Sequence, residues 1–361
     1  MRVVIKVGSQ SILSPAGEPL LDEIKSVIEQ IITLNQAGHQ VILVSSGAVA
    51  LGRGIARKIL NREYGNNVAD KQLLASLGQP QLMAIYTKLC EERGYLAAQL
   101  LLTKYDFQTK RSYTNILRLL QKSLAQENVI TIINENDSVA VDELMFTDND
   151  ELSGIIAAQI GADKLLLLTS IDGVYTKNPS DPDAQLIHEV HVSDELPDLN
   201  GKSSLGRGGM SSKLTTARKM ARVGVMTHIA SLAEHNVIEK LVLADEKLGT
   251  RVIPEHKQAA RKKYLAFTQD NPHAQVSANW GLVKALSKNH ATSILPIGIE
   301  AINGTFKRGD LLEILNPDGI KIGVGIAKYN SAKLTEYLGG HNHPELIHYD
   351  YLHIDYDVIG N

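Results

Sequence analysis

The sequence predicts an α/β sandwich with a mainly parallel sheet, joined to a second domain that is small and mostly β. Up to about residue 250, short apolar runs rich in Val, Ile and Leu alternate with amphipathic stretches, which is typical of buried parallel strands joined by helices. This alternation stops near Pro254. Beyond it, turn signals recur about every ten residues between short apolar runs, which indicates a small β module.

Each element of the first domain is predicted from one such run or stretch. The predicted strands cover residues 3–7, 40–44, 95–102, 129–133 and 164–169. The predicted helices between them cover residues 22–36, 70–92, 111–126 and 151–160. Ligands of open parallel sheets bind beyond the carboxyl ends of the strands, so we expect the functional residues to follow the predicted strands.

The domain boundaries follow from a change of composition. Residues 255–273 contain the basic tract Arg261-Lys262-Lys263 and then a polar stretch with Asn271-Pro272, which indicates a linker. We therefore predict a first domain over residues 1–255, a linker over 256–274 and a β domain over 275–361. The turn signals of the last domain are Gly298, Asn303-Gly304, Arg308-Gly309-Asp310 and Asn316-Pro317-Asp318-Gly319.

The composition excludes several classes of protein. The 361 residues include 37 basic and 40 acidic side chains, a formal charge of −3, which argues against nucleic-acid wrapping and against adhesion to an anionic membrane. Cys90 is the single cysteine, so no internal disulfide and no thiolate zinc site can form. The N-terminus lacks a signal-peptide pattern, and no apolar stretch approaches the roughly 20 residues of a membrane span. We expect a cytoplasmic protein.

The ends of the first two predicted strands carry small residues that suit an anion. Lys6-Val7-Gly8-Ser9 ends the first strand, and Ser45-Ser46-Gly47-Ala48 ends the second and leads into a helix. A glycine lets backbone N–H groups approach a ligand closely, and a small-residue turn at a helix start can present several of them. Each turn alone is compatible with plain loop geometry, but two at adjacent strand ends predict an anion site.

Acidic and amide side chains follow the fourth predicted strand. Asn134-Glu135-Asn136-Asp137 comes directly after it, and Thr147-Asp148-Asn149-Asp150-Glu151 opens the next helix. The second group also suits helix capping. Together these groups could bind an ammonium group, orient lysines, or hold a hard divalent ion such as Mg²⁺.

A glycine-rich loop with cations lies further along the chain. Leu205-Gly206-Arg207-Gly208-Gly209-Met210-Ser211-Ser212-Lys213-Leu214 ends in a predicted helix start, a combination that suits a polyphosphate. The Walker spacing, the GxGxxG run and the protein-kinase motifs are absent. The C-terminal histidines His341, His343, His348 and His353 lack helical i, i+4 spacing, so we predict no protein-held metal site there.

Taken in order, these motifs resemble the amino acid kinase family, in the branch that phosphorylates glutamate. The resemblance covers residues 2 to about 255 and depends on Lys6-Val7-Gly8-Ser9, Ser45-Ser46-Gly47-Ala48, Ile133-Asn134-Glu135-Asn136-Asp137, Asp148-Asn149-Asp150, Leu168-Thr169 and Gly208-Gly209-Met210-Ser211-Ser212-Lys213. Beyond the linker, three segments resemble the PUA domain: residues 293–299, 304–310 and 325–331. The resemblance implies a three-layer αβα sandwich followed by a PUA-like domain.

The resemblance also implies a reaction and roles for single residues. The reaction is ATP-dependent phosphorylation of the γ-carboxylate of L-glutamate to glutamyl 5-phosphate, the first step of proline biosynthesis, with Mg²⁺ on the ATP. Lys6 and Lys213 would flank the transferred phosphoryl group and Asp150 would orient both. Glutamate would be held by Ser46, Asp137 and Asn149. ATP would be bound by Lys6, Thr169, Ser170, Arg207, Gly208, Gly209, Met210, Ser211, Ser212 and Lys213.

Two departures from the family pattern lie on the nucleotide side. Ser170 stands where the family usually has Asp, and Arg207 stands where it often has Thr; both bear on nucleotide preference rather than on the acceptor. Two alternatives stay open: a family member with another acceptor, such as carbamate, aspartate, acetylglutamate or UMP, and an RNA-binding or RNA-modifying protein. From residue 275 onward seven Lys and Arg stand against nine Asp and Glu, which disfavours a nucleic-acid surface.

The resemblance further implies partners. We expect a homo-oligomer, proline as a feedback inhibitor, and a glutamyl phosphate reductase that receives the product, because acyl phosphates hydrolyse readily. Neither a membrane nor a nucleic acid is an expected partner.

Overall fold

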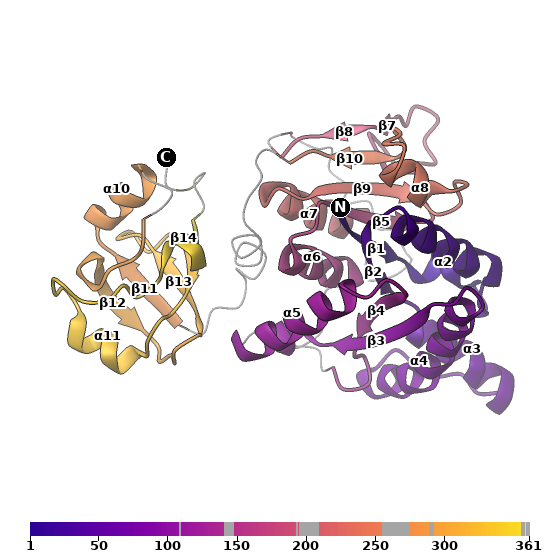
Figure 1. Ribbon diagram of the computed structural model, residues 1–361, viewed down its shortest axis with the longest axis horizontal. Coiled ribbons are helices and arrows are strands. Elements are labelled where there is room, and N and C mark those ends of the chain that lie inside the picture. Colours follow the sequence, from indigo (N-terminus) through magenta and orange to yellow (C-terminus); the bar gives the residue numbers. More distant parts are fainter. Residues whose placement is uncertain are drawn as a thin grey trace. The chain divides into compact units, whose positions relative to one another are not determined.

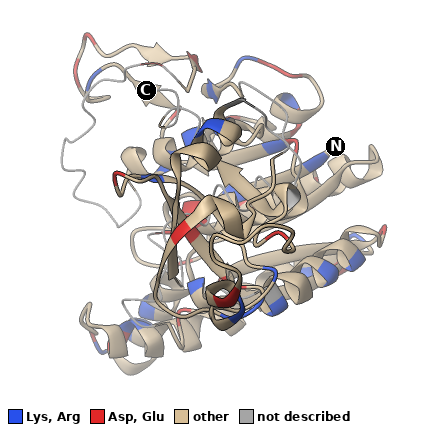
Figure 2. Ribbon diagram, turned by 90° about the vertical axis from the view of Figure 1, so that its left-hand side faces the viewer, with Lys and Arg blue, Asp and Glu red and all other residues tan. Residues whose placement is uncertain are grey.

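A computed structural model describes residues 1–107, 110–140, 148–192, 194, 209–254, 274–288, 292–354 and 358. The chain forms two compact units (Figure 1). The first contains Met1–Lys104 and Leu117–Lys257, and the second contains Tyr105–Ile116 and Gln258–Asn361. The domain boundaries at residues 255 and 275 remain predictions. Basic and acidic residues are interspersed along the described ribbon (Figure 2).

The described residues of the first unit form an eight-stranded sheet with the order β3-β4-β2-β1-β5-β9-β10-β8. Its strands are β1 (Arg2–Val7), β2 (Gln40–Ser45), β3 (Leu96–Leu102), β4 (Val129–Glu135), β5 (Lys164–Thr169), β8 (Glu189–Val190), β9 (Met226–Ser231) and β10 (Thr250–Val252). All neighbours run parallel except β9 and β10. The predicted α/β fold with a mainly parallel sheet is confirmed.

Helices connect these strands, as the alternating pattern predicts. They are α1 (Ser9–Ile12), α2 (Leu21–Gln36), α3 (Ala48–Leu60), α4 (Val68–Glu91), α5 (Lys110–Leu124), α6 (Asn149–Ile160), α7 (Met210–Arg222) and α8 (Val237–Val242), with a 3₁₀ turn at Lys104–Phe107. A two-stranded hairpin joins β6 (Val174–Tyr175) and β7 (Leu186–Ile187). The strand β9 is missing from the sequence prediction, because the polar residues Thr227 and His228 interrupt its apolar run although both are buried. Among the described residues, no helix is long and apolar enough to cross a bilayer.

The sheet is covered by helices on both faces, which confirms the three-layer arrangement. Along β1, Val3, Ile5 and Val7 pack in one core with residues of α2, α4 and α8. Successive side chains of a strand point to opposite faces, so Val4 and Lys6 face the other layer. There α6 packs against β1, and α7 packs against β9 and against α6 (Figure 1). The alternation along β1 thus directs Lys6 toward α6.

The second unit has its own sheet and its own core. The sheet order is β12-β11-β13-β14-β15, with β11 (Ala274–Ala278), β12 (Ile299–Asn303), β13 (Leu311–Leu315), β14 (Lys321–Ile326) and β15 (Leu352–Ile354). The helices α10 (Trp280–Lys288) and α11 (Ser331–Tyr337), and 3₁₀ turns at Pro296–Gly298 and Tyr349–Tyr351, accompany it. Its buried cluster includes Val276, Leu312 and Leu334 and contains no residue of the first unit's cluster. The predicted small, mostly β domain is confirmed.

The helices α3 and α4 approach each other at two glycines. A Cβ atom added to Gly78 would lie 1.9 Å from the carbonyl oxygen of Ala48, and one added to Gly52 would lie 1.9 Å from that of Leu74. Such contacts leave no space for any side chain. Gly47, at the start of α3, has φ +113°, a backbone conformation that favours glycine. This close packing fixes the start of α3, which lies just after the end of β2.

We predict that Gly78→Ala destabilises the protein, because the added methyl group must push α3 away from α4. The gain in helix propensity is about 1 kcal/mol, whereas overpacking costs typically 1–3 kcal/mol and more when backbone atoms must move. Urea unfolding should therefore show a lower midpoint. Ser76→Ala, on an exposed position of the same helix, is the control and should change the midpoint little. A Gly78→Ala protein as stable as the wild type would contradict the tight helix contact.

Candidate active site at the carboxyl ends of the strands

The candidate site forms where the central parallel strands end. In the register of the sheet, Val7 of β1 is paired with Ser45 of β2 and Leu168 of β5, and Val44 of β2 is paired with Ile133 of β4. The segments that follow these strands therefore begin side by side. The predicted motifs after β1, β2, β4 and β5 share one edge of the sheet because the strands are parallel neighbours.

A buried carboxylate joins two lysines at this edge. The Oδ1 atom of Asp150 lies 2.7 Å from Nζ of Lys6, and its Oδ2 atom accepts a hydrogen bond from Nζ of Lys213 at 2.8 Å. Lys6 comes from β1, Asp150 from the first turn of α6 and Lys213 from the first turn of α7. Asp150 is fully buried, and the lysines are 5% and 6% exposed. Asp150 and Lys213 follow Lys6 by 144 and 207 positions in the sequence. The three side chains therefore meet only because β1, α6 and α7 pack together.

The two lysines keep this carboxylate ionised. Burial by itself would raise the pKa of Asp150, but the charges of Lys6 and Lys213 and their hydrogen bonds outweigh burial and hold the pKa below its usual range. A carboxylate with both oxygens held by ammonium groups is a poor proton acceptor. Asp150 is therefore suited to orienting the two lysines rather than to general-base catalysis.

Asp148 caps the helix that carries Asp150. Its Oδ1 atom accepts hydrogen bonds from the N–H groups of Asp150 at 2.9 Å and Glu151 at 3.1 Å. This confirms the capping interpretation of the acidic motif. Its Oδ2 atom is buried, and the side chain of Ser212, in the first turn of α7, interacts with the Asp148 carboxylate. Burial, and then the charge of Asp150, raise the pKa of Asp148, whereas the interaction with Ser212 lowers it.

Asn149 ties α6 to two strand ends. Its Nδ2 atom lies within hydrogen-bond distance of the Ser45 carbonyl oxygen at 3.0 Å, Ser46 Oγ at 2.9 Å and Asn134 Oδ1 at 2.8 Å. Its own Oδ1 atom is buried and has no partner among the described residues. Buried acceptors are normally satisfied, so the unpartnered oxygen of Asn149 is suited to a ligand that donates hydrogen bonds.

The remaining predicted site residues occupy three places. Asp137 lies half-buried in the turn after β4, and Thr169 and Ser170 lie at the end of β5. Gly209 precedes α7, and Met210, Ser211 and Ser212 form its first turn. No side chain of the described residues caps α7, so its first N–H groups are suited to an anion. Arg207 and Gly208 lie outside the described residues.

Four residues that support this site are not among the site residues predicted from the sequence. Asn134 donates to Gln79 Oε1 at 2.8 Å while it accepts from Asn149, and Ser45 Oγ lies 2.8 Å from the hydroxyl of the buried Tyr86. Asn134 stands in the acidic and amide motif, which could have pointed to it. Gln79 and Tyr86 come from α4 and have no sequence signal, because a polar residue in an amphipathic helix is ordinarily read as exposed.

The described residues hold no cluster of three or more His, Cys, Asp or Glu side chains arranged for a metal ion. A further ion pair joins Lys104 and Glu151 at 3.6 Å, and Glu151 follows Asp150 in the sequence. The site therefore contains two lysines that share one carboxylate, an unpartnered amide oxygen and two uncapped helix starts.

Comparison with known proteins gives a consistent result. Residues 1–231 match the amino acid kinase family, and residues 275–344 match the PUA domain. A protein of Bacteroides thetaiotaomicron named glutamate 5-kinase is 38% identical over 358 residues and covers 98% of both chains. Proteins of the same name from Chlorobaculum tepidum and Trichlorobacter lovleyi are 37% and 39% identical, over 98% and 96% of this chain and 97% and 91% of theirs.

Two solved structures align with about 70% of this chain. An isopentenyl phosphate kinase of T. acidophilum has a TM-score of 0.49 at 16% identity and covers 70% of this chain and 100% of its own. A UMP kinase of Bacillus anthracis has a TM-score of 0.48 at 15% identity and covers 71% of this chain and 96% of its own.

We predict that Asp150→Asn strongly destabilises the chain, because two buried ammonium groups would lose their shared counter-ion. Removing one partner of a buried ion pair costs roughly 3–5 kcal/mol, which urea unfolding at pH 7 measures. The control is Asp245→Asn. Asp245 is also 2.7 Å from a lysine, Lys164, but it is 63% exposed, so its loss should cost at most about 1 kcal/mol. Equal losses for the two variants would mean that burial of the Asp150 pair carries no energetic weight.

Proposed function

This chain belongs to the amino acid kinase family, and we propose that it transfers the γ-phosphoryl group of ATP to the γ-carboxylate of L-glutamate. The product is glutamyl 5-phosphate, the first intermediate of proline biosynthesis. The observation that carries the proposal is the buried Lys6–Asp150–Lys213 arrangement at the carboxyl ends of the strands. Relatives named glutamate 5-kinase, which are similar over nearly the whole chain, support glutamate as the acceptor.

The chemistry needs fixed positive charge more than a base. A γ-carboxylate oxygen forms a bond to the γ-phosphorus while the bond to the β,γ-bridging oxygen breaks, and ADP leaves with the electron pair. A carboxylate is already ionised at pH 7, so no proton has to be removed. The transition state spreads negative charge over the phosphoryl oxygens. This agrees with a site in which Asp150 is held by lysines and is unsuited to accept a proton.

Lys6 and Lys213 supply this charge from two sides. Because they bind different oxygens of Asp150, the carboxylate holds them on separate sides of one anchor. Both are buried, and in a site of low dielectric a fixed ammonium group stabilises developing negative charge more strongly than it does in water. We assign them the transferred phosphoryl group and ascribe to Asp150 the orientation of both.

Glutamate would be held by the residues after β2 and β4 and at the start of α6. The ammonium group of the substrate is a hydrogen-bond donor and suits the unpartnered oxygen of Asn149, together with the carboxylate of Asp137. The α-carboxylate suits Ser46 and the start of α3, which no side chain caps.

ATP would be held at the ends of β5 and at the start of α7. Thr169, Ser170 and the residues from Gly209 to Lys213 contribute, and the uncapped N–H groups of α7 suit the phosphates. Arg207 and Gly208 keep their predicted role in this loop. The presence of Ser170, where the family usually has Asp, bears on nucleotide preference.

Mg²⁺ would enter with the nucleotide. Both oxygens of Asp150 are engaged by lysines, so this carboxylate is not available as a metal ligand. Mg²⁺ commonly takes phosphate oxygens and water with few protein ligands, and ATP offers these. When bound, the ion neutralises phosphate charge while the lysines act on the transferred group.

Further partners remain proposals. An acyl phosphate hydrolyses readily, which favours direct transfer to a glutamyl phosphate reductase. Proline as a feedback inhibitor, a homo-oligomeric state and a cytoplasmic location are proposed with it. The alternatives, another acceptor or RNA, have no observation in their favour among the described residues.

We predict that ATP, Mg²⁺ and L-glutamate in the presence of hydroxylamine yield γ-glutamyl hydroxamate, because hydroxylamine traps the acyl phosphate. Colorimetric detection with ferric ion measures it. Aspartate, acetylglutamate and carbamate serve as competing acceptors, with UMP followed by ADP release. A higher kcat/KM with any of these than with glutamate would overturn the proposed acceptor.

We predict that Lys213→Met, which keeps the length of the side chain and removes its charge, lowers kcat by about 10²-fold or more, as the loss of one oxyanion-type donor does. Lys6→Met should act alike. Steady-state kinetics at saturating glutamate and ATP measure the effect. Lys240→Met removes a lysine from a partly exposed ion pair outside the site and should leave kcat unchanged. Near-normal kcat in both active-site variants would refute the two-lysine mechanism.

We predict that Asp137→Asn raises KM for glutamate and leaves KM for ATP nearly unchanged, since its proposed partner is an ammonium group present throughout the reaction. Glutarate, which lacks that ammonium group, provides a matched substrate. Glutarate should react poorly with the wild type, and its KM should not rise further in Asp137→Asn. If glutarate and glutamate suffered equally, Asp137 would have a structural role instead.

A further inference from the structure

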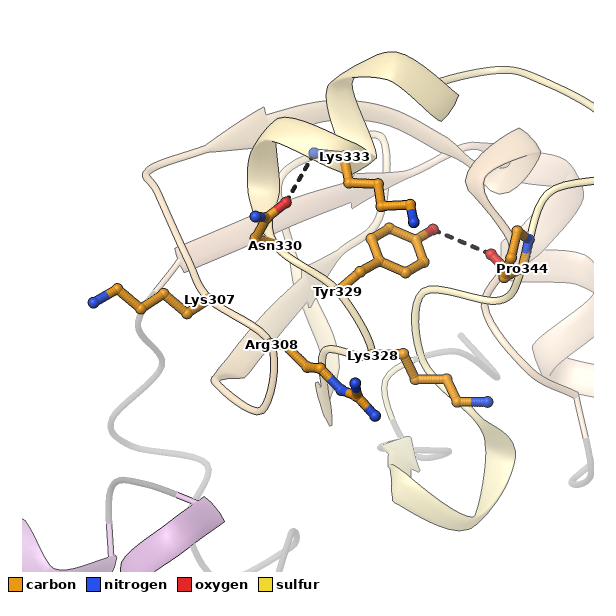
Figure 3. A pocket seen from close by; sticks show the side chains of 7 residues that line it. All are labelled: Lys307, Arg308, Lys328, Tyr329, Asn330, Lys333 and Pro344. Atoms are coloured by element: carbon orange, nitrogen blue, oxygen red, sulfur yellow. Dashed lines mark hydrogen bonds between the residues drawn. The ribbon is translucent and has the colours of Figure 1, made fainter.

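A basic hollow lies in the second unit, on residues that the candidate active site does not use. Its volume is about 500 Å³, and it is lined by Lys307, Arg308, Lys328, Tyr329, Asn330, Lys333 and Pro344 (Figure 3). We call it the basic pocket. Four of its seven lining residues are cationic and none is a carboxylate. Such a lining indicates an anionic ligand.

Backbone hydrogen bonds preform the pocket from two chain segments. One is the turn that leads into β13, where the N–H of Lys307 donates to Asp310 Oδ2 at 2.8 Å. The other follows β14 and leads into α11. Gly309 N donates to the Ala327 carbonyl at 2.8 Å, and Ser331 N donates to the Phe306 carbonyl at 3.0 Å. The cations of both segments are therefore held near one another without a ligand.

Tyr329 forms the apolar wall between these cations. Its ring is 9% exposed and its hydroxyl donates to the Pro344 carbonyl oxygen at 3.2 Å. In Figure 3, Arg308 and Lys328 lie on one side of the ring and Lys333 on the other. Burial raises the pKa of Tyr329 to about 12, so the wall stays neutral at physiological pH. The Nζ atom of Lys333 also lies 5.6 Å from the centre of the Tyr337 ring, which holds this cation at the pocket by a cation–π contact.

The charge of the pocket is largely uncompensated. Lys328 is paired with Glu345, whereas Lys307, Arg308 and Lys333 have no ion pair within the described residues. From residue 275 onward the chain carries seven Lys and Arg and nine Asp and Glu. Four of those seven cations thus gather at one hollow of a region that is otherwise acidic. A concentration of this kind points to a compact ligand with several negative charges.

We propose that the basic pocket binds a small anion that carries a phosphate chain, either inorganic polyphosphate or the phosphates of a nucleotide. The volume is within the range of small-molecule sites, which is about 300–1,000 Å³. Arg308 offers the planar, bidentate donors that match phosphate, and the lysines add point charges. An extended nucleic acid needs a track of cations along the surface, and the three other Lys and Arg of this region stand against nine acidic residues.

Titration calorimetry on the full chain with inorganic pyrophosphate tests the proposal. Binding should weaken at least about tenfold in Arg308→Gln with Lys333→Gln, because both lost charges would contact phosphate. The matched control is Lys284→Gln with Lys321→Gln, which removes the same charge from the same unit outside the pocket and should keep the affinity. The Lys213→Met variant distinguishes pyrophosphate bound at the active site from pyrophosphate bound at the basic pocket. Binding at the basic pocket should persist in this variant.

Three results would overturn the proposal. The first is pyrophosphate binding that disappears in Lys213→Met alone. The second is an equal loss of pyrophosphate affinity in the pocket and control pairs. The third is pocket-dependent binding of a single-stranded RNA that is tighter than that of pyrophosphate or ATP.

Comparison of pyrophosphate, AMP and ATP shows whether the source is inorganic phosphate or a nucleotide. Circular dichroism checks the folding of each variant, and Lys307→Gln with Lys328→Gln is a second pocket pair. Neither pair should change kcat with glutamate at saturating ATP.

Discussion

One buried carboxylate between two ammonium groups is the constraint on which the rest of the first unit depends. Asp150 is fully buried and holds Lys6 and Lys213 at 2.7 and 2.8 Å. Three charges in a low-dielectric interior are tolerated only if their geometry is held fixed, because each one has lost its water. The central position of β1, the docking of α6 on it and the contact of α6 with α7 provide this. The same rigidity presets the positive charge that phosphoryl transfer requires.

Polar groups that the fold leaves unpartnered surround this centre. The side-chain oxygen of Asn149 and the uncapped starts of α3 and α7 would each be unfavourable in a closed core. Gathered at one edge of the sheet, they match an ammonium group, a carboxylate and phosphates. The close contact of α3 with α4 excludes any side chain at Gly52 and Gly78 and fixes the position of the start of α3. The packing of α3 against α4 thus also positions the start of α3 for binding a ligand.

The two units use cations in different ways. In the first unit the two lysines of the site are buried and share one carboxylate, so they are held rigidly, keep a net positive charge and act on charge that develops during a reaction. In the second unit Lys307, Arg308 and Lys333 are exposed and gather around a buried tyrosine, which suits reversible binding of an anion from solvent. Because the units have separate hydrophobic cores, each arrangement is stabilised within its own unit.

The sequence alone determined the class of fold and most of the candidate site. Apolar runs predicted β1 to β5, because strands of a helix-covered sheet are largely apolar, although β3 lies at the sheet edge and is mostly only partly buried. The positions of Lys6, Ser46 and Thr169 near strand ends followed from these runs, and that of Asn149 from the predicted start of the next helix. The sequence could not predict β9, whose Thr227 and His228 are buried polar residues, nor the support that Gln79 and Tyr86 give from α4. The family resemblance implied that Asp150 orients Lys6 and Lys213, but only the tertiary structure shows the three side chains in contact. Contacts between distant segments depend on how helices pack against a sheet, and local patterns of residues carry no record of that packing.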